Sequence, residues 1–128
     1  MIDHISIQVR NLALSKTFYS AVLAPLGLTE FVSRPAAVGF GKKYPEFWIN
    51  LRPESSPENV NSGNHICLRA PSEESVLAFY DAALAHGGSC SGPPGVRKAE
   101  LRPYFAAFIL DPDGHKIEAA TFPSSGNV

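Results

Sequence analysis

The fold is decided by a short segment that occurs twice in the chain, as "HISIQV" at residues 4–9 and as "HICLRA" at residues 65–70. In both copies apolar residues alternate with others, which is the pattern of a β-strand with one face against a core. The histidine that opens each copy belongs to the opposite face. We therefore expect two equivalent strands, each with one apolar face and one face that carries a histidine.

The similarity extends past these strands at the same offset of 61 residues. The segment "FYSAVLAPLG" at residues 18–27 matches "FYDAALAHGG" at residues 79–88 in its Phe-Tyr pair and its final glycine. Agreement at one fixed offset indicates an internal duplication. Chance agreement between two amphipathic segments is the alternative, but matched histidines and Phe-Tyr pairs are not generic features of such segments.

Each copy is predicted to continue as one helix and three shorter strands. Apolar residues at every fourth position predict the first helix, namely Leu14, Phe18, Val22 and Leu26. Ser72 is a favoured N-cap for the second helix, whose buried stripe is predicted to contain Val76, Phe79, Tyr80, Ala83 and Leu84. The shorter strands are predicted at 29–34, 37–41 and 46–51, and at 89–91, 105–110 and 116–121.

These elements predict an α+β fold with two β-α-β-β-β modules in one domain, residues 1–128. The first module is expected at about residues 1–52 and the second at about residues 64–122. Residues 53–63 are polar and rich in Pro and Ser, as expected of a linker. The segment "GPPGVRKAELRP" at residues 92–103 is predicted to be a long loop, and we favour a lid over a plain connection.

Composition limits the functions to consider. The chain has 45% hydrophobic residues and a net charge of −1, so nothing in its bulk charge favours nucleic acid or a membrane surface. No apolar run is long enough to span a membrane, and "MIDHISIQV" does not resemble a signal peptide. The two cysteines are too few for a disulfide framework. We expect a cytoplasmic protein that acts on a small molecule.

The residues that could carry chemistry lie on the polar faces of the predicted strands. In "DPDGHKIEAA", residues 111–120, a turn leads into a strand where Glu118 alternates with the apolar Ile117 and Ala119. Glu118 can therefore point away from the helix-covered core, as His4 and His65 can. Two histidines and one carboxylate are a possible metal site that leaves positions open for substrate.

The chain resembles members of the vicinal oxygen chelate superfamily, which groups glyoxalase I, bleomycin-resistance proteins, extradiol dioxygenases and fosfomycin-resistance thiol transferases. The resemblance covers nearly the whole chain and is carried by "DHISIQV", "FYSAVLAPLGL", "NHICLRA", "FYDAALAHGG" and "FILDPDGHKIEAA". It implies paired βαβββ modules that form a curved, cup-like mixed sheet with the helices on the outside. It also implies a divalent metal inside the cup, held by His4, His65 and Glu118.

Departures from the family pattern bear on the reaction. Glyoxalase I-like members carry a glutamate where this chain has Asn50, and an amide cannot take a proton near neutral pH. Glyoxalase I chemistry is therefore disfavoured. Extradiol dioxygenases and fosfomycin thiol transferases remain, although both tend to have a tyrosine where Phe108 stands. Ser6 and Lys98 lie at positions where the thiol-transferase resemblance places pocket residues.

The leading hypothesis is a metal-dependent enzyme, a dioxygenase, transferase or lyase, that uses Fe, Mn, Zn or Ni. The alternative is a metal-free protein that sequesters a ligand or antibiotic in the same cup. A homodimer is expected in either case. The modules could pair within one chain, or between two chains so that His4 of one chain joins His65 and Glu118 of the other. The sequence leaves both arrangements open.

Overall fold

The repeated segment forms the first strand of each module in the computed structural model, which describes residues 1–57, 62–98 and 102–123. The first module contains β1 (Ile5–Val9), α1 (Leu12–Leu23), the short 3-10 helix η1 (Ala24–Leu26), β2 (Thr29–Arg34), β3 (Ala37–Gly41) and β4 (Pro45–Leu51). The second contains β5 (Ile66–Arg69), α2 (Glu73–Ala85), β6 (Ser89–Arg97), β7 (Tyr104–Leu110) and β8 (Lys116–Thr121). The predicted α+β class and the βαβββ order are confirmed.

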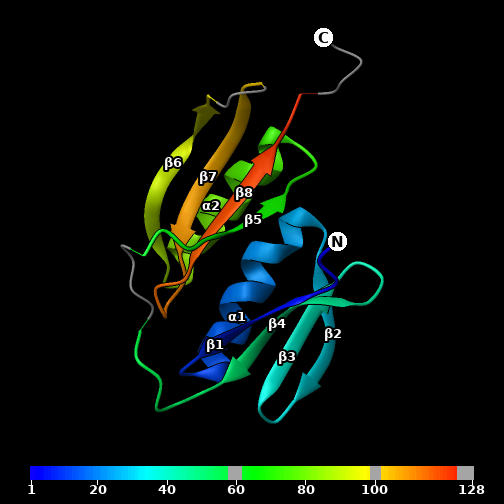
Figure 1. Cartoon of the computed structure of the whole chain (residues 1–128), viewed down its shortest axis with the longest axis vertical. Helices are drawn as coiled ribbons and strands as arrows, with labels where there is room; N and C mark the ends of the chain where they lie inside the picture. Colours follow the sequence, from blue (N-terminus) through cyan, green and yellow to red (C-terminus); the bar gives the residue numbers. More distant parts are fainter. Residues whose placement is uncertain (58–61, 99–101, 124–128) are drawn as a thin grey trace.

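Each module has its own four-stranded mixed sheet (Figure 1). The strand order is β1-β4-β3-β2 in the first and β5-β8-β7-β6 in the second. In both, the first strand runs parallel to the last, and the remaining pairs are antiparallel. Within the described residues the sheets do not pair with each other, so β1 and β5 are edge strands.

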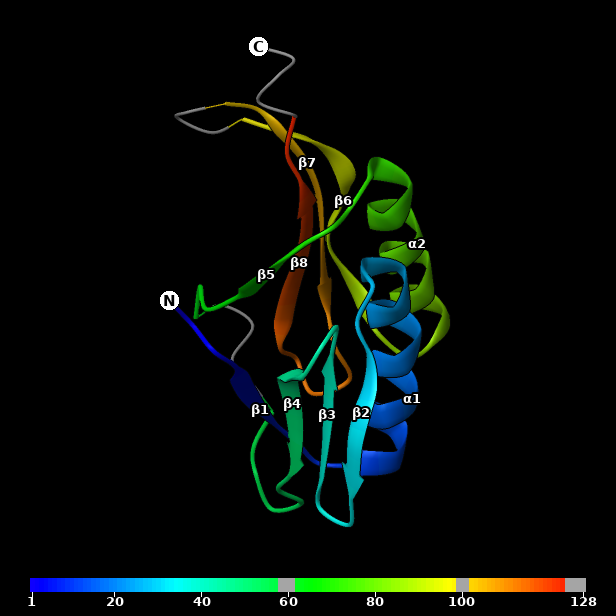
Figure 2. The same cartoon turned by 90° about the vertical axis from the view of Figure 1, so that its right-hand side faces the viewer.

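The helices cover one face of each sheet. Figure 2 shows α1 and α2 on the same side of the sheets, and the two helices pack against each other. This leaves the opposite face of each sheet without a helix. In the described part of the chain, neither helix combines the length and the apolar character needed to cross a membrane.

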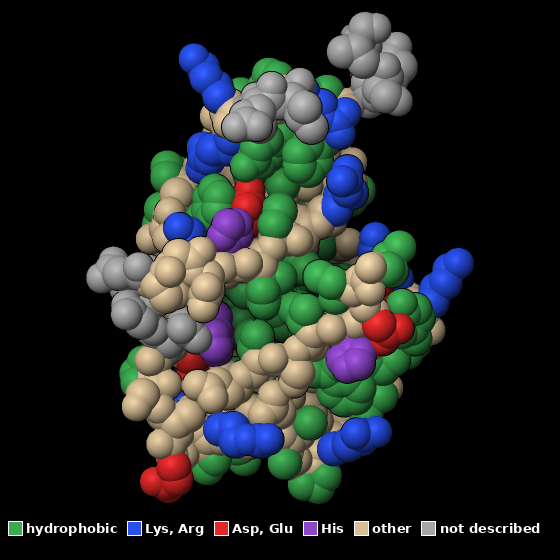
Figure 3. All heavy atoms as spheres, viewed as in Figure 1, with side chains coloured by type: hydrophobic (Ala, Val, Ile, Leu, Met, Phe, Trp, Pro, Cys, Tyr) green, Lys and Arg blue, Asp and Glu red, His purple; other side chains and the backbone are tan. Residues whose placement is uncertain are grey.

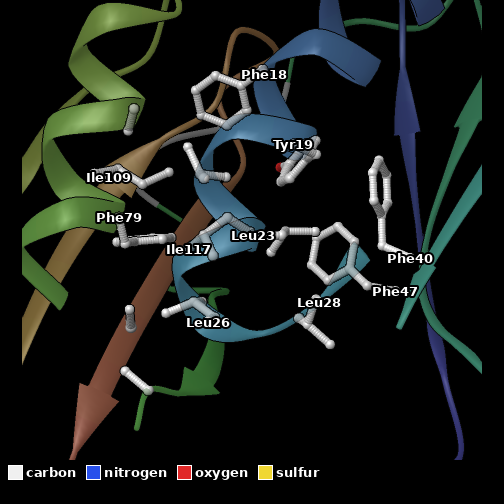
Figure 4. Close-up of a cluster of buried hydrophobic side chains, with 14 of the residues drawn as sticks. Phe18, Tyr19, Leu23, Leu26, Leu28, Phe40, Phe47, Phe79, Ile109 and Ile117 are labelled. Atoms are coloured by element: carbon white, nitrogen blue, oxygen red, sulfur yellow. The ribbon is translucent and has the colours of Figure 1, made fainter. Parts of the chain in front are cut away.

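A hydrophobic core joins the modules (Figure 4). Phe18 and Leu23 of α1 are fully buried between Phe47 of the first sheet and Ile109 and Ile117 of the second. Burial of one such side chain stabilises the fold by about 1.5–3 kcal/mol. In each strand, the side chains that point to this core are those of the apolar face predicted from the sequence.

Three sequence predictions need correction. Leu14 and Leu84 were expected in buried stripes, but they are 47% and 45% exposed. The strand predicted at 89–91 continues to Arg97, so half of the expected loop at 92–103 is β6. β6 is an edge strand with register shifts beside Gly92, and such bulges accommodate Pro93 and Pro94, which cannot donate to a regular ladder. Residues 99–101 of the expected lid lie outside the described residues.

A buried polar junction connects the β7–β8 loop of the second module to the first module. The Tyr19 hydroxyl donates to Asp111 Oδ2 at 2.6 Å, and Arg10 Nε donates to Asp113 Oδ1 at 2.9 Å. His115 Nε2 lies 2.6 Å from the carbonyl oxygen of Gln8. Asp111 and Asp113 are 4% and 6% exposed, so these bonds replace water that burial removes.

The junction predicts a pH-dependent effect of Tyr19→Phe. Burial raises the pKa of Asp111, and the Tyr19 hydroxyl partly offsets that rise. A carboxyl whose pKa is raised in the folded protein contributes stability at low pH. This contribution is lost as the pH rises through the folded-state pKa. Loss of the hydroxyl donor should therefore lower the free energy of unfolding by about 1–3 kcal/mol near neutral pH, and by less as the pH falls.

Chemical denaturation of both proteins over a range of pH measures this difference. Tyr44→Phe is the matched control, because Tyr44 is 48% exposed and should lose no buried hydrogen bond. A destabilisation by Tyr19→Phe that stayed constant with pH would contradict the role given to Asp111.

Candidate functional site

The uncovered face of the second sheet places a carboxylate at its centre. Glu118 on β8 lies between Cys67 of β5 and Phe108 of β7, which are its register partners on either side. The strand alternation that buries Ile117 and Ala119 against the helices turns Glu118 to this face, as the sequence predicted. Despite the absence of a covering helix, Glu118 is 3% exposed.

His65 and Glu118 form the central pair of the site. His65 Nε2 lies 3.2 Å from Glu118 Oε1, and the side chain of His65 is 39% exposed. Glu118 Oε2 is buried and has no hydrogen-bond partner within the described residues. A buried carboxylate oxygen without a partner costs folding free energy. The pair therefore joins a ligand-type carboxylate to an imidazole that solvent and small molecules can reach.

Two proton-bearing groups lie next to this carboxylate. Cys67 is exposed at the surface, but partial burial of its thiol against the sheet raises the pKa to about 12, and the Glu118 carboxylate adds to the rise. The pKa of the Tyr104 hydroxyl is raised in the same way, first by burial and then by Glu118. Both groups keep their protons near neutral pH, so Cys67 is not an activated nucleophile in this environment.

The uncovered face of the first sheet holds the other predicted residues. The amide of Asn50 donates to Ser6 Oγ at 2.7 Å and to the carbonyl oxygen of Ile7 at 3.0 Å. His4 precedes β1, where its Nδ1 lies 2.7 Å from Asp3 Oδ1, and its side chain is 56% exposed. Arg34 lies over the ring of Trp48 on the same sheet, 5.3 Å from the centroid. Asn50 and Ser6 thus form one hydrogen-bonded unit.

Within one chain, the structure unites part of the predicted ligand set. His65 and Glu118 are in contact, but no group of three or more His, Cys, Asp or Glu side chains in the described residues is arranged to hold a metal ion. His4 therefore does not reach the pair from within its own chain. Lys98 is exposed beyond the end of β6, and its pocket role stays a prediction. The ligand role of His4 also stays a prediction.

A groove of about 270 Å³ lies between the edge strands β1 and β5. His4, Phe47 and Cys67 are among its lining residues. Figure 3 shows hydrophobic side chains in this central hollow, between the histidine-bearing regions of the visible face. The groove separates the His4 region from the second sheet, which explains geometrically why a single chain does not assemble the full ligand set.

The chemistry of the donor set fits a divalent metal. Imidazole and carboxylate are ligands that iron, manganese, zinc and nickel all accept. Oε2 of Glu118 is buried and accepts no hydrogen bond of ordinary geometry from the described residues, although the Cys67 thiol and the Tyr104 hydroxyl both interact with the carboxylate. Two of the three residues predicted as ligands thus meet within one chain, and their role as ligands stays a prediction.

Sequence reasoning did not identify Tyr104 as a site residue. It noted that the family's tyrosine position is taken by Phe108, whose ring lies 5.6 Å from that of His65. Tyr104 comes four residues earlier on β7, so the strand period of two places it on the same face. The alternation along this strand is a sequence feature that predicts Tyr104 on the same face as Phe108, and therefore near the site.

The burial of Glu118 predicts that its charge destabilises the metal-free protein. Glu118→Gln should raise the free energy of unfolding without metal by about 1 kcal/mol, because a neutral amide replaces a buried, incompletely bonded charge. Thermal denaturation with a chelator present measures the change. Glu54→Gln, at an exposed position, is the control and should have no effect. A lower melting temperature for Glu118→Gln would mean that the carboxylate stabilises the folded chain.

Comparison with known proteins agrees with this architecture. A structure of a glyoxalase/bleomycin resistance protein from Albidiferax ferrireducens has a TM-score of 0.83 and 31% sequence identity, over 94% of this chain and 98% of that chain. Fosfomycin resistance protein FosX from Mesorhizobium loti has a TM-score of 0.69 and 17% identity, over 99% and 96% of the two chains. FosX from Listeria monocytogenes has a TM-score of 0.70 and 19% identity, over 100% and 98%. At these lower identities the likeness establishes the fold.

Among curated proteins the comparison finds no match. The model of one family matches residues 1–119, nearly the whole chain, and the resemblance stated from the sequence is confirmed. The chain belongs to the glyoxalase/bleomycin resistance protein/dioxygenase superfamily.

Proposed function

We propose that this protein is a divalent-metal-dependent enzyme that acts on a small oxygen-chelating substrate. The observation that carries the proposal is the pair of His65 and Glu118, in contact at 3.2 Å on an uncovered sheet face. A buried carboxylate with an unpartnered oxygen is costly for folding, and a metal ligand is a reason to retain it. Iron, manganese, zinc and nickel all fit these donors.

We propose further that the third ligand is His4 of a second copy of the chain. His4 does not join the pair within its own chain, and the groove between β1 and β5 separates the two regions. Both strands are edges with unpaired backbone groups, which is the kind of surface that pairs with another chain. A homodimer that set the first module of one copy beside the second module of the other would give two equivalent sites.

The residues of the site would divide the chemical work. A bound divalent ion would supply Lewis acidity toward two oxygens of the substrate. His65 and Glu118 would hold it, and open positions would remain for substrate. Tyr104 and Cys67, with their raised pKa values, would remain protonated and could donate hydrogen bonds near the Glu118 carboxylate.

The identity of residue 50 favours some reactions over others. The amide of Asn50 is already bonded to Ser6 and to backbone, and it cannot accept a proton as a carboxylate would. A dioxygenase-like or thiol-transferase-like reaction therefore fits better than proton transfer of the glyoxalase I type. The two FosX proteins among the structural neighbours are fosfomycin resistance proteins by name, and fosfomycin with a thiol is a reasonable first assay.

A metal-free sequestering protein is the alternative function. The exposed Trp48–Arg34 face and the apolar groove would suit ligand capture without catalysis. The alternative does not account for a buried Glu118 in contact with His65, whose Oε2 accepts no hydrogen bond of ordinary geometry in the described part of the chain, and this favours the enzyme.

The proposed intersubunit site predicts complementation between inactive variants. His4→Ala and Glu118→Gln should each lower metal affinity at least tenfold, because each removes a ligand from every site. In a mixed dimer of the two variants, one site would combine the intact His4 of one chain with the intact His65 and Glu118 of the other. Co-expression with two affinity tags, tandem purification and elemental analysis should therefore recover about half of the wild-type metal content.

His86→Ala is the matched control, because His86 caps α2 and its Nδ1 lies 2.9 Å from the carbonyl oxygen of Ala82, on an exposed helix end. Its metal content should equal that of the wild type. A mixed dimer with no more metal than either parent variant would indicate pairing within one chain. Unchanged affinity in both His4→Ala and Glu118→Gln would reject the metal site itself.

A further inference from the structure

Positively charged side chains held against aromatic rings mark a second part of the uncovered face. The guanidinium of Arg69, at the end of β5, lies 4.7 Å from the ring centroid of Phe122, and that of Arg102 lies 5.2 Å from the same ring. Tyr104 stacks on Phe122 with the ring centroids 4.9 Å apart and the planes 20° from parallel. We call these four residues the arginine corner.

Ring and backbone contacts position these guanidinium groups. A cation over an aromatic ring gains about 0.5–1 kcal/mol at an exposed site, enough to favour one side-chain placement. Arg102 also donates from Nη1 to the carbonyl oxygen of Pro123 at 3.1 Å. The corner therefore presents two guanidinium groups around one ring, an arrangement that suits an incoming carboxylate.

The charge around the corner has the same sign. Lys116 and Arg97 lie 5.0 Å and 5.6 Å from the ring centroid of Phe108, a ring that also packs against His65. None of these four cations forms an ion pair with an acidic side chain in the described part of the chain. Figure 3 shows Lys and Arg side chains around the margin of the upper sheet, with acidic surface inside beside a histidine. On a chain of net charge −1 this excess of positive charge is local.

The corner lies on the same uncovered sheet face as the proposed metal ligands, by strand alternation. Arg69 follows Cys67 by two residues on β5, and Cys67 is the register partner of Glu118. Two residues along a strand span about 7 Å. The rings of Phe108 and Tyr104 line the intervening face. A separate hollow of about 280 Å³ adjoins Tyr104 and Phe122, but its lining includes Glu73 and neither Arg69 nor Arg102, so it is not the carboxylate site.

We propose that Arg69 and Arg102 bind the carboxylate of a small aromatic acid whose other end reaches His65 and Glu118. The guanidinium pair accounts for the anion, and the aromatic rings beside it account for a planar body. This inference rests on the proposed function for the reacting end of the ligand. Binding of the carboxylate end requires no metal, so the two proposals can fail separately.

Binding of trans-cinnamate to the full chain, measured by isothermal titration calorimetry with a chelator present, tests the corner. Cinnamate joins a carboxylate to a flat ring, and cinnamamide has the same shape without the charge. We expect the wild type to bind cinnamate at least tenfold more tightly than cinnamamide. Arg69→Gln and Arg102→Gln should each weaken cinnamate binding at least tenfold, and Arg69→Lys should weaken it less than Arg69→Gln, because it keeps the charge but loses the fork of donors.

Lys43→Gln is the matched control, since it removes one positive charge from an exposed position between β3 and β4 and should leave binding unchanged. Thermal denaturation of each variant checks that it remains folded. The proposal is overturned if wild-type protein does not bind cinnamate, if both arginine variants bind it as the wild type does, or if cinnamamide binds equally well. If inorganic phosphate displaced cinnamate equally well, the corner would be a general anion site and not a site for an aromatic acid.

Metal content measured on the same variants separates the two proposals. Arg69→Gln should keep the metal content of the wild type, and Glu118→Gln should lose metal while it still binds cinnamate. Cinnamate binding by a wild-type protein that takes up no metal would support the corner and reject the metal-dependent function. Metal uptake by a wild-type protein that does not bind cinnamate would support the metal-dependent function and reject the arginine corner.

Discussion

The buried contact between the β7–β8 loop and the start of the first module fixes how the modules lie in one chain. Tyr19, Arg10 and the backbone at Gln8 are bonded to Asp111, Asp113 and His115, all from one short loop. Hydrogen bonds constrain direction as well as distance, unlike the apolar contacts of the adjoining core. In the same arrangement α1 packs against α2, and both uncovered sheet faces lie on the side opposite the helices (Figure 2).

That geometry has a direct effect on the candidate site. His65 and Glu118 meet because β5 pairs with β8 within the second sheet, while the placement of the modules leaves His4 across the groove between the edge strands. The duplication places His4 and His65 at equivalent positions in the two modules. Equivalent positions in two modules need not lie close together in space. The same chain can therefore be well folded and bring together only part of the proposed ligand set, which makes association with a second copy part of the proposed chemistry.

Much of the fold was predictable because the modules follow local rules. The period-two alternation around Ile117 and Ala119 identified the face of Glu118, and Ser72 caps α2 as predicted. β6 was predicted too short because Pro93 and Pro94 read as a loop, and the bulges that accommodate them depend on an edge position that sequence does not reveal. Leu14 was assigned to the core from its period alone, although the stripe it belongs to is narrower than predicted.

The candidate site was less predictable, since its features depend on contacts between distant segments. Tyr104 comes fourteen residues before Glu118 on a neighbouring strand, and the effect of the carboxylate on its pKa follows from the register of β7 with β8. The arginine corner joins Arg69 to Phe122, which no local pattern connects. The position of His4 follows from the placement of the modules, which the sequence left open.

The parallel pairing of the first strand of each module with its last strand also constrains the order in which the chain can fold. β1 has no neighbour until β4 is available, and β5 has none until β8 is available. Closure of such long loops is costly in entropy and tends to be slow. During synthesis the first module can complete its sheet before the second has left the ribosome, since domains and modules form from the N-terminus onward. The loop of the polar junction directly precedes β8, so docking of the modules and completion of the second sheet would take place together, once β8 is available.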